Sequence, residues 1–241
     1  MPSQTAFRPL REEPHTLSEQ VYQALLAAII ERRIAPGEAF AVVDLAAQLN
    51  VSRTPVRDAL SRLTAEGLVQ AKGRRGFQVI PLTAEDLTYL YETRLMCELF
   101  SVEKGLAVVT PRFLAELEGI IDDYAALLSA PSPANEARAF LRDAEFHRRI
   151  VGLAANPRIS EIFERLNIHI NSARVGPHPD GYANRQGLGR ARHQAVIAAL
   201  HTGDLAVAKQ AVREHIEGGR ERTIASLRLG QVGGGENLPG E

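Results

Sequence analysis

Residues 51–67 read VSRTPVRDALSRLTAEG and predict one short helix with defined ends. Ser52 is a favourable N-cap, Pro55 falls in the first turn, where a missing N–H is tolerated, and Gly67 stands where helices commonly stop. Apolar residues recur at helical spacing on one face: Val56, Leu60 and Leu63. The other face carries polar residues: Arg53, Thr54 and Arg57. Such side chains bind phosphates and read base edges, so the stretch is typical of a DNA recognition helix, although an ordinary amphipathic helix would share the pattern.

The neighbouring segments place this helix in a larger pattern. A capping box at residues 16–19 begins an earlier helix, and residues 44–49 carry a second short one. Downstream, residues 68–72 and 77–80 read as two strands joined by a basic, glycine-bounded tip. The tip residues are Lys72, Gly73, Arg74, Arg75 and Gly76. The order predicts a winged helix-turn-helix of three helices plus a β-hairpin wing over residues 16–81.

The run from Leu17 to Pro81 resembles the winged helix-turn-helix head of GntR-type bacterial transcription regulators, above all in SRTPVRDALSRL. The following residues resemble the all-helical effector domain of the FadR branch, called the FCD domain, so that the two matches cover about 16–225. The resemblance implies that Ser52, Arg53, Thr54 and Arg57, with the wing tip, contact double-stranded operator DNA. Val43 departs from the pattern, because some relatives have a DNA-contacting arginine there.

Composition sets the remaining bounds. The chain has 241 residues, a net charge of −1 and one cysteine, which permits no internal disulfide. It contains no 18-residue uncharged apolar run, so we expect a cytoplasmic protein without a membrane segment. We expect a mainly α fold with a disordered arm over residues 1–15, a helical bundle of six or seven helices over 82–229 and a disordered tail over 230–241. Within the bundle, residues 176–187 read as a loop.

Four polar residues of the predicted helical bundle fall on inward helix faces. Asp143 and His147 are one helical turn apart, and each of His193 and His215 shares a stripe with apolar residues. Unpartnered burial of these groups would be costly, and a divalent metal relieves that cost. Hydrogen-bonded core histidines and a surface Asp–His pair are the alternative. The resemblance implies the metal, because DAEFH, RHQAVIAALHTGD and AVREH match positions where metal-bearing relatives keep ligands. Zinc is the first choice, with nickel, cobalt or manganese also suited.

Arg94 and Glu98 form another pair one turn apart. They fit a surface salt bridge, but the resemblance implies that Arg94 holds a ligand carboxylate, and we expect both Arg94 and Glu98 to belong to the effector-binding site. We therefore expect a homodimeric, ligand-responsive transcription regulator that binds operator DNA, a divalent metal and a small carboxylate-bearing metabolite, and that is not an enzyme. The alternatives are a metal-dependent enzyme and a DNA-binding dimer whose effector domain stays empty.

Overall fold

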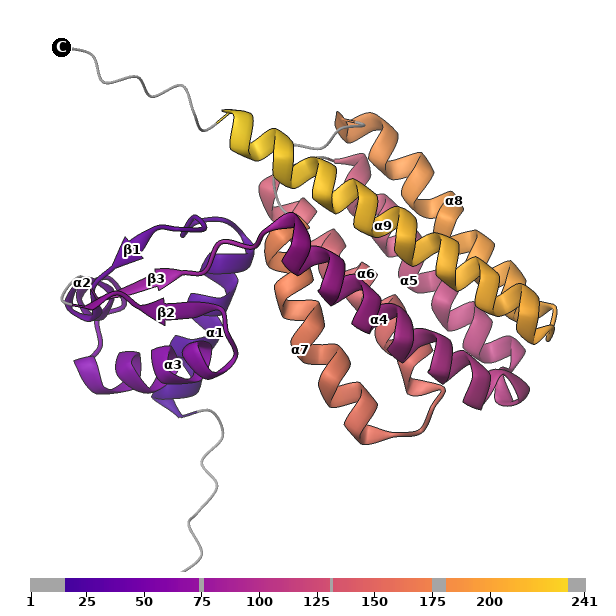
Figure 1. Ribbon diagram of the computed structural model, residues 1–241, viewed down its shortest axis with the longest axis horizontal. Coiled ribbons are helices and arrows are strands. Elements are labelled where there is room, and N and C mark those ends of the chain that lie inside the picture. Colours follow the sequence, from indigo (N-terminus) through magenta and orange to yellow (C-terminus); the bar gives the residue numbers. More distant parts are fainter. Residues whose placement is uncertain (1–15, 74–75, 131, 175–180, 234–241) are drawn as a thin grey trace, which may run out of the picture. The chain divides into compact units, whose positions relative to one another are not determined.

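The computed structural model describes residues 16–73, 76–130, 132–174 and 181–233 (Figure 1). It divides into two compact units, one with residues up to 27 and 37–80, the other with residues 28–36 and those from 81 onward. Predictions for residues 1–15, Arg74, Arg75 and 234–241 lie outside the described residues.

The first unit has the elements of a winged helix-turn-helix. They are α1 (Leu17–Ile30), β1 (Ala39–Phe40), α2 (Val42–Gln48), α3 (Arg53–Ala65), β2 (Val69–Ala71) and β3 (Phe77–Val79). The strands form an antiparallel sheet in the order β1-β3-β2. Strand β1 was not predicted from the sequence, because two residues are too few to show an alternating pattern.

Helix α3 has the predicted ends and the predicted inward face. Val56, Leu60 and Leu63 are all fully buried. Gly67 adopts a φ of +77°, the left-handed conformation in which glycine is favoured after a helix. Ser52 occupies the N-cap position, but its side chain makes no capping hydrogen bond. Only its position therefore agrees with the sequence-based expectation.

The wing depends on one close backbone approach. The N–H of Lys72 donates to the carbonyl oxygen of Gly76 at 2.7 Å and closes the hairpin. Gly76 has a φ of +90°, and a Cβ atom there would lie 2.3 Å from the carbonyl oxygen of Phe40 in β1. A side chain at this position is therefore excluded by both the backbone conformation and the space.

The second unit is a helical bundle. Its helices are α4 (Ala84–Gly105), α5 (Pro111–Ser129), α6 (Pro133–Gly152), α7 (Pro157–Arg174), α8 (Gly181–His201) and α9 (Leu205–Gly233). Thr83 and Asp86 form the capping box that begins α4. Helix α8 begins within the segment that was predicted as a loop, and α9 continues past residue 230, where the tail was predicted to begin. Figure 1 shows α9 lying between α4 and α8.

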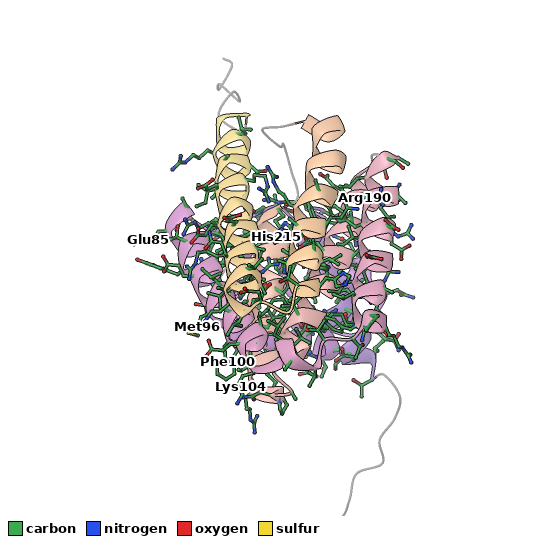
Figure 2. All side chains as sticks on the ribbon, turned by 90° about the vertical axis from the view of Figure 1, so that its right-hand side faces the viewer. Glu85, Met96, Phe100, Lys104, Arg190 and His215 are labelled. Carbon is green, nitrogen blue, oxygen red and sulfur yellow. The ribbon has the colours of Figure 1, made fainter. Side chains whose placement is uncertain are left out.

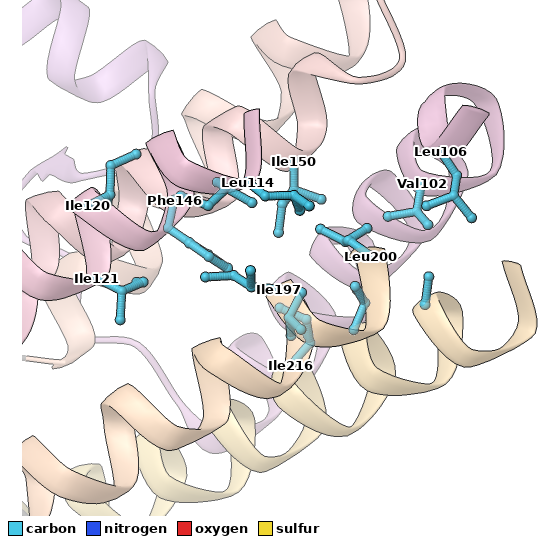
Figure 3. Packing of buried hydrophobic residues seen from close by; sticks show 14 of the residues in the cluster. Val102, Leu106, Leu114, Ile120, Ile121, Phe146, Ile150, Ile197, Leu200 and Ile216 are labelled. Carbon is cyan, nitrogen blue, oxygen red and sulfur yellow. The ribbon is translucent and has the colours of Figure 1, made fainter. Parts of the chain in front are cut away.

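The core of this unit is an apolar cluster to which each of the helices α4 to α9 contributes (Figure 3). Phe146 and Ile150 of α6 are fully buried in it, and Leu200 of α8 is nearly so. At one end α4 approaches α6 closely, because a Cβ atom at Gly105 would lie 2.2 Å from the carbonyl oxygen of Leu153. None of the helices in the described residues is long and apolar enough to span a membrane.

Candidate functional site

A cavity lies inside the helical unit, with walls from α4 to α9. Its volume is about 60 Å³. Polar and charged residues dominate its lining: Tyr91, Arg94, Tyr124, Asp143, His147, Arg174, Arg192, His193, His215, Arg222, Thr223 and Ser226. Since such residues are rarely gathered inside a bundle without a ligand, this cavity is the candidate functional site.

Three histidines from three helices converge in the cavity. One ring nitrogen from each of His147, His193 and His215 can be chosen so that all three lie within 4.8 Å of one another. The Nε2 atoms of His147 and His215 are 3.1 Å apart. Figure 2 shows His215 between the helices rather than on the outer surface. The structure thus brings together three of the four side chains predicted as metal ligands.

Hydrogen bonds at Nδ1 orient two of these rings. The Nδ1 atom of His193 lies 2.7 Å from the carbonyl oxygen of Gly189, so it must carry the proton and donate. The Nδ1 atom of His147 lies 2.8 Å from Oε2 of Glu98, where an ionised carboxylate accepts in the same way. Both Nε2 atoms are then left with lone pairs. Partners of this kind are what metal-binding histidines ordinarily have on the nitrogen away from the metal.

The cavity keeps two of its imidazoles, those of His147 and His215, neutral. Burial lowers the pKa of His147 well below its ordinary value, and the positive charge of Arg94 acts in the same direction. Burial and the neighbouring His193 lower the pKa of His215 likewise. The Nδ1 atom of His215 is buried and has no hydrogen-bond partner among the described residues. Neutral imidazole is the form that binds a metal, so the donors fit a divalent ion.

Asp143, the fourth predicted ligand, lies beside this cluster but is bound elsewhere. Its Oδ1 atom is 3.2 Å from Nε2 of His193, and the guanidinium of Arg174 bonds both carboxylate oxygens. Burial, the largest single influence, would raise the pKa of Asp143, but the charge of Arg174 and weaker contributions from its neighbours together hold the pKa well below its usual range. The carboxylate is therefore ionised next to the imidazoles, and one arginine competes for it.

The Arg94–Glu98 pair is not a surface salt bridge. Arg94 is 2% exposed and Glu98 is fully buried, with Nε of Arg94 2.8 Å from Oε1 of Glu98. Burial raises the pKa of Glu98 to about 7, although Arg94 opposes the shift. Arg94 lines the cavity, as predicted for an effector-binding residue, whereas Glu98 does not. Glu98 instead contacts Nδ1 of His147, the ring nitrogen away from the other two histidines. The expected effector contact of Glu98 therefore has no support in this geometry.

Sequence reasoning missed three arginines of the cavity, Arg174, Arg192 and Arg222. Arg174 ends the predicted helix α7, but a sequence gives no sign that it turns toward Asp143. Arg192 lies on α8, whose first turns were assigned to a loop. The only available signal for Arg222 is the Gly218–Gly219 pair just before it, which is unusual inside a helix.

In the first unit the predicted DNA-contacting side chains are free to meet a duplex. Ser52, Arg53, Thr54 and Arg57 are all exposed at the start of α3. Among the described residues, no carboxylate lies within 4 Å of either arginine. The first N–H groups of a helix also lack partners within it and favour phosphate.

The wing and α2 complete this exposed surface. Lys72 and Gly73 are exposed at the described part of the wing tip, and Gly76 is half-buried. Val43 of α2 is 59% exposed, so an apolar side chain stands where some relatives have an arginine.

Arg62, on the same helix, has a structural role. Its guanidinium lies 2.6 Å from a carboxylate oxygen of Glu19 in α1 and 3.2 Å from one of Glu66. It also stacks 3.6 Å above the ring centre of Tyr22. These contacts tie α3 to α1 and occupy the arginine.

Comparison with protein families gives two matches. Residues 17–79 match the model described as "Bacterial regulatory proteins, gntR family". Residues 89–218 match the model of the FCD domain. The two matches fall on the two structural units described above.

Individual proteins are similar over much of the chain. The Nta operon transcriptional regulator of Aminobacter aminovorans is 34% identical over 139 residues, which are 58% of this chain and 64% of that protein, slightly less than two thirds of its length. The HTH-type transcriptional regulator YdhC of Bacillus subtilis is 26% identical over 68% of this chain and 72% of its own. A crystal structure of a transcriptional regulator GntR from Rhodococcus sp. RHA1 superposes with a TM-score of 0.71 at 25% identity, covering 87% of this chain and 98% of that one.

Proposed function

Because the chain belongs to the GntR family of bacterial regulatory proteins and carries an FCD domain, we propose that it is a DNA-binding transcription regulator controlled through its helical unit. The helical unit binds a divalent metal ion and a small organic acid, and the acid changes the affinity of the protein for operator DNA. The observation that carries this proposal is the convergence of three imidazoles, two of them buried, beside an ionised carboxylate.

The metal ligands are His147, His193 and His215, with Asp143 as the fourth. The tautomers set by Gly189 and Glu98 support this assignment, because they turn Nε2 lone pairs toward one point. Three imidazoles and one carboxylate suit zinc, with nickel, cobalt or manganese as further candidates. A bound ion supplies a positive charge and positions for ligand oxygen atoms.

The organic acid is proposed from the arginines of the cavity. Arg94 is nearly fully buried and reaches the lining from α4, next to the imidazoles. A guanidinium recognises a carboxylate through paired hydrogen bonds. A coupling free energy of about 1 to 3 kcal/mol between the acid and the DNA would change operator affinity by roughly 5- to 150-fold.

The DNA contacts are proposed for Ser52, Arg53, Thr54, Arg57 and the wing tip. Among the residues that the structure describes, no carboxylate lies within 4 Å of Arg53 or Arg57, and this supports the assignment. A single recognition helix reads few base pairs, so we also propose a homodimer that presents two heads to a two-fold operator.

The face of α4 opposite the cavity supports the dimer. It carries Tyr89, Met96 and Phe100, which are 57%, 62% and 42% exposed. Figure 2 shows Met96 and Phe100 on the outer edge of the helical unit. An exposed apolar stripe of this kind is typical of a protein interface.

The DNA part of the proposal is tested by selecting bound duplexes from a random library and measuring their affinity by fluorescence anisotropy. Arg53→Ala with Arg57→Ala should weaken binding at least tenfold and lower the salt dependence by about two phosphate contacts. Arg112→Ala with Arg158→Ala is the charge-matched control, because these two arginines are 90% and 82% exposed and each has an acidic partner on its own helix. Equal affinities for all three proteins would contradict the proposed DNA surface.

The metal part is tested by titrating the chelator-treated protein with Zn²⁺ in a calorimeter. His215→Ala should abolish tight binding, whereas His201→Ala should not, since His201 is exposed at the end of α8 and outside the cavity. The sensor mechanism fails if zinc and carboxylates leave duplex affinity unchanged. The two sequence relatives above are named as transcriptional regulators, which argues against the metal-dependent enzyme.

A further inference from the structure

The geometry points to an effector with two acidic groups: we propose that one group binds at the imidazole cluster and that Arg222, assisted by Arg192, holds the other. The inference rests on the proposed function, because it concerns the same cavity. It adds the class of the effector, a short dicarboxylate, and the residues that select it.

The side chain of Arg222 lines the cavity and lies over two glycines of its own helix. Side chains on a helix lean toward its N-terminus, and Arg222 folds back over Gly218 and Gly219. A Cβ atom at Gly218 would lie 3.0 Å from Nη1 of Arg222, and one at Gly219 would lie 3.8 Å from Nη2. Each glycine costs a helix interior about 1 kcal/mol relative to alanine, so the pair needs a reason. At Gly218 that reason is room for this guanidinium, whereas a Cβ atom at Gly219 would meet the ring of Tyr91 first, at 3.4 Å.

The charges of the cavity leave Arg192 and Arg222 unmatched. Arg94 is paired with Glu98, and Arg174 is paired with Asp143. Within the part of the chain that the structure describes, no carboxylate lies within 4 Å of Arg192 or Arg222. Burial and the charges of Arg192 and Arg174 lower the pKa of Arg222 to about 10. Crowded positive groups without counter-ions favour an anion that brings more than one negative charge.

The distance between the two ends fits a short molecule. The guanidinium of Arg222 lies beside Gly218, three residues after His215, which corresponds to about 4.5 Å along the axis of α9. A four- or five-carbon dicarboxylate can bridge this distance. The hydroxyl groups of Thr223 and Ser226, which also line the cavity, are on the same side of α9 as Arg222.

Calorimetric titrations of zinc-loaded protein with succinate, glutarate and butyrate test the inference. Succinate or glutarate should bind 10- to 100-fold more tightly than butyrate, because a second charge-assisted contact is made. Arg222→Gln should remove this advantage and leave the affinities for butyrate and Zn²⁺ within twofold of wild type. Arg228→Gln, an exposed arginine on the same helix, is the matched control and should keep the advantage.

The outcomes separate the two proposals. If butyrate binds as tightly as succinate and glutarate, or if Arg222→Gln weakens butyrate and succinate equally, the two-point effector is wrong while acid binding by the cavity stands. If none of the three acids binds, the proposed function of the cavity fails together with the inference. Unchanged Zn²⁺ binding in Arg222→Gln shows that the variant is folded.

Discussion

Glu98→Gln should weaken zinc binding although Glu98 would not touch the metal. In the wild-type protein Oε1 of Glu98 accepts from Arg94, and Oε2 faces Nδ1 of His147 at 2.8 Å. A glutamine has one acceptor oxygen, and the guanidinium of Arg94, always a donor, requires it. The amide NH₂ group then faces Nδ1 of His147, which must become an acceptor. The ring proton therefore moves to Nε2, the atom proposed to bind the metal.

The size of the effect follows from the cost of reversing that change. For zinc to bind the variant, His147 must return its proton to Nδ1, which leaves two buried donors facing each other. An unsatisfied buried donor costs about 1 to 3 kcal/mol, and loss of such a supporting group typically lowers metal affinity 10- to 100-fold.

The assay is competition against a chromophoric chelator at pH 8, where the wild-type carboxyl group is ionised. Glu116→Gln is the control, since Glu116 pairs with an arginine whose side chain is 90% exposed, and it should bind zinc like the wild type. A Glu98→Gln variant that binds zinc within twofold of wild type would refute the reasoning.

Three further predictions concern the fold, its pH dependence and its assembly. Gly76→Ala should lower the free energy of unfolding by at least about 2 kcal/mol in urea denaturation, because of its positive φ and the nearby carbonyl oxygen of β1, whereas Gly119→Ala, in open space within α5, should leave it unchanged or raise it by up to about 1 kcal/mol. Burial lowers the pKa of two cavity imidazoles, so below the ordinary value of 6.5 the unfolded chain gains two protons there that the folded metal-free protein does not; Glu98, whose pKa is raised to about 7, gains one proton only in the folded protein and offsets part of this difference. The Tm after chelation should therefore fall as pH drops from 7 toward 5, and a Tm that rises over this range would contradict the neutral imidazoles. Met96→Glu with Phe100→Glu should convert the proposed dimer to monomer in light scattering, and Ile162→Glu, exposed on α7, should not; a dimer that survives the double change places its interface elsewhere.

The parts of the fold that were predictable are those encoded in neighbouring residues. Caps, proline and glycine stops and helical spacing act within a few residues, which is why the limits of α3 and the capping box of α4 could be predicted. Glycines gave a wrong boundary for α8: its sequence, GYANRQGLGRARHQ, has three of them, and packing against α5 and α9 overrides their low helix propensity.

The candidate site was predictable only in part for the same physical reason. The pair Asp143 and His147 follows from spacing along one helix, and apolar stripes placed His193 and His215 on inward helix faces. That all four bind one metal was implied by the resemblance to a family. The contact of Arg174 with Asp143 and that of Glu98 with His147 join different helices. Contacts of this kind depend on how helices are rotated and shifted against one another, which periodicity along the chain does not specify.

The close approach of Gly105 to Leu153 limits where the helical unit can move. Counted back from this junction, Glu98 lies seven residues along α4 and His147 six residues along α6, about 10 Å and 9 Å by helical rise. The junction fixes how far α4 and α6 are shifted along each other, so these two side chains stay at similar distances from it. Neither helix can slide past the other without breaking this contact. A signal that starts in the cavity must therefore travel through tilting of helices outside this junction, among them α8 and α9, which carry His193 and His215.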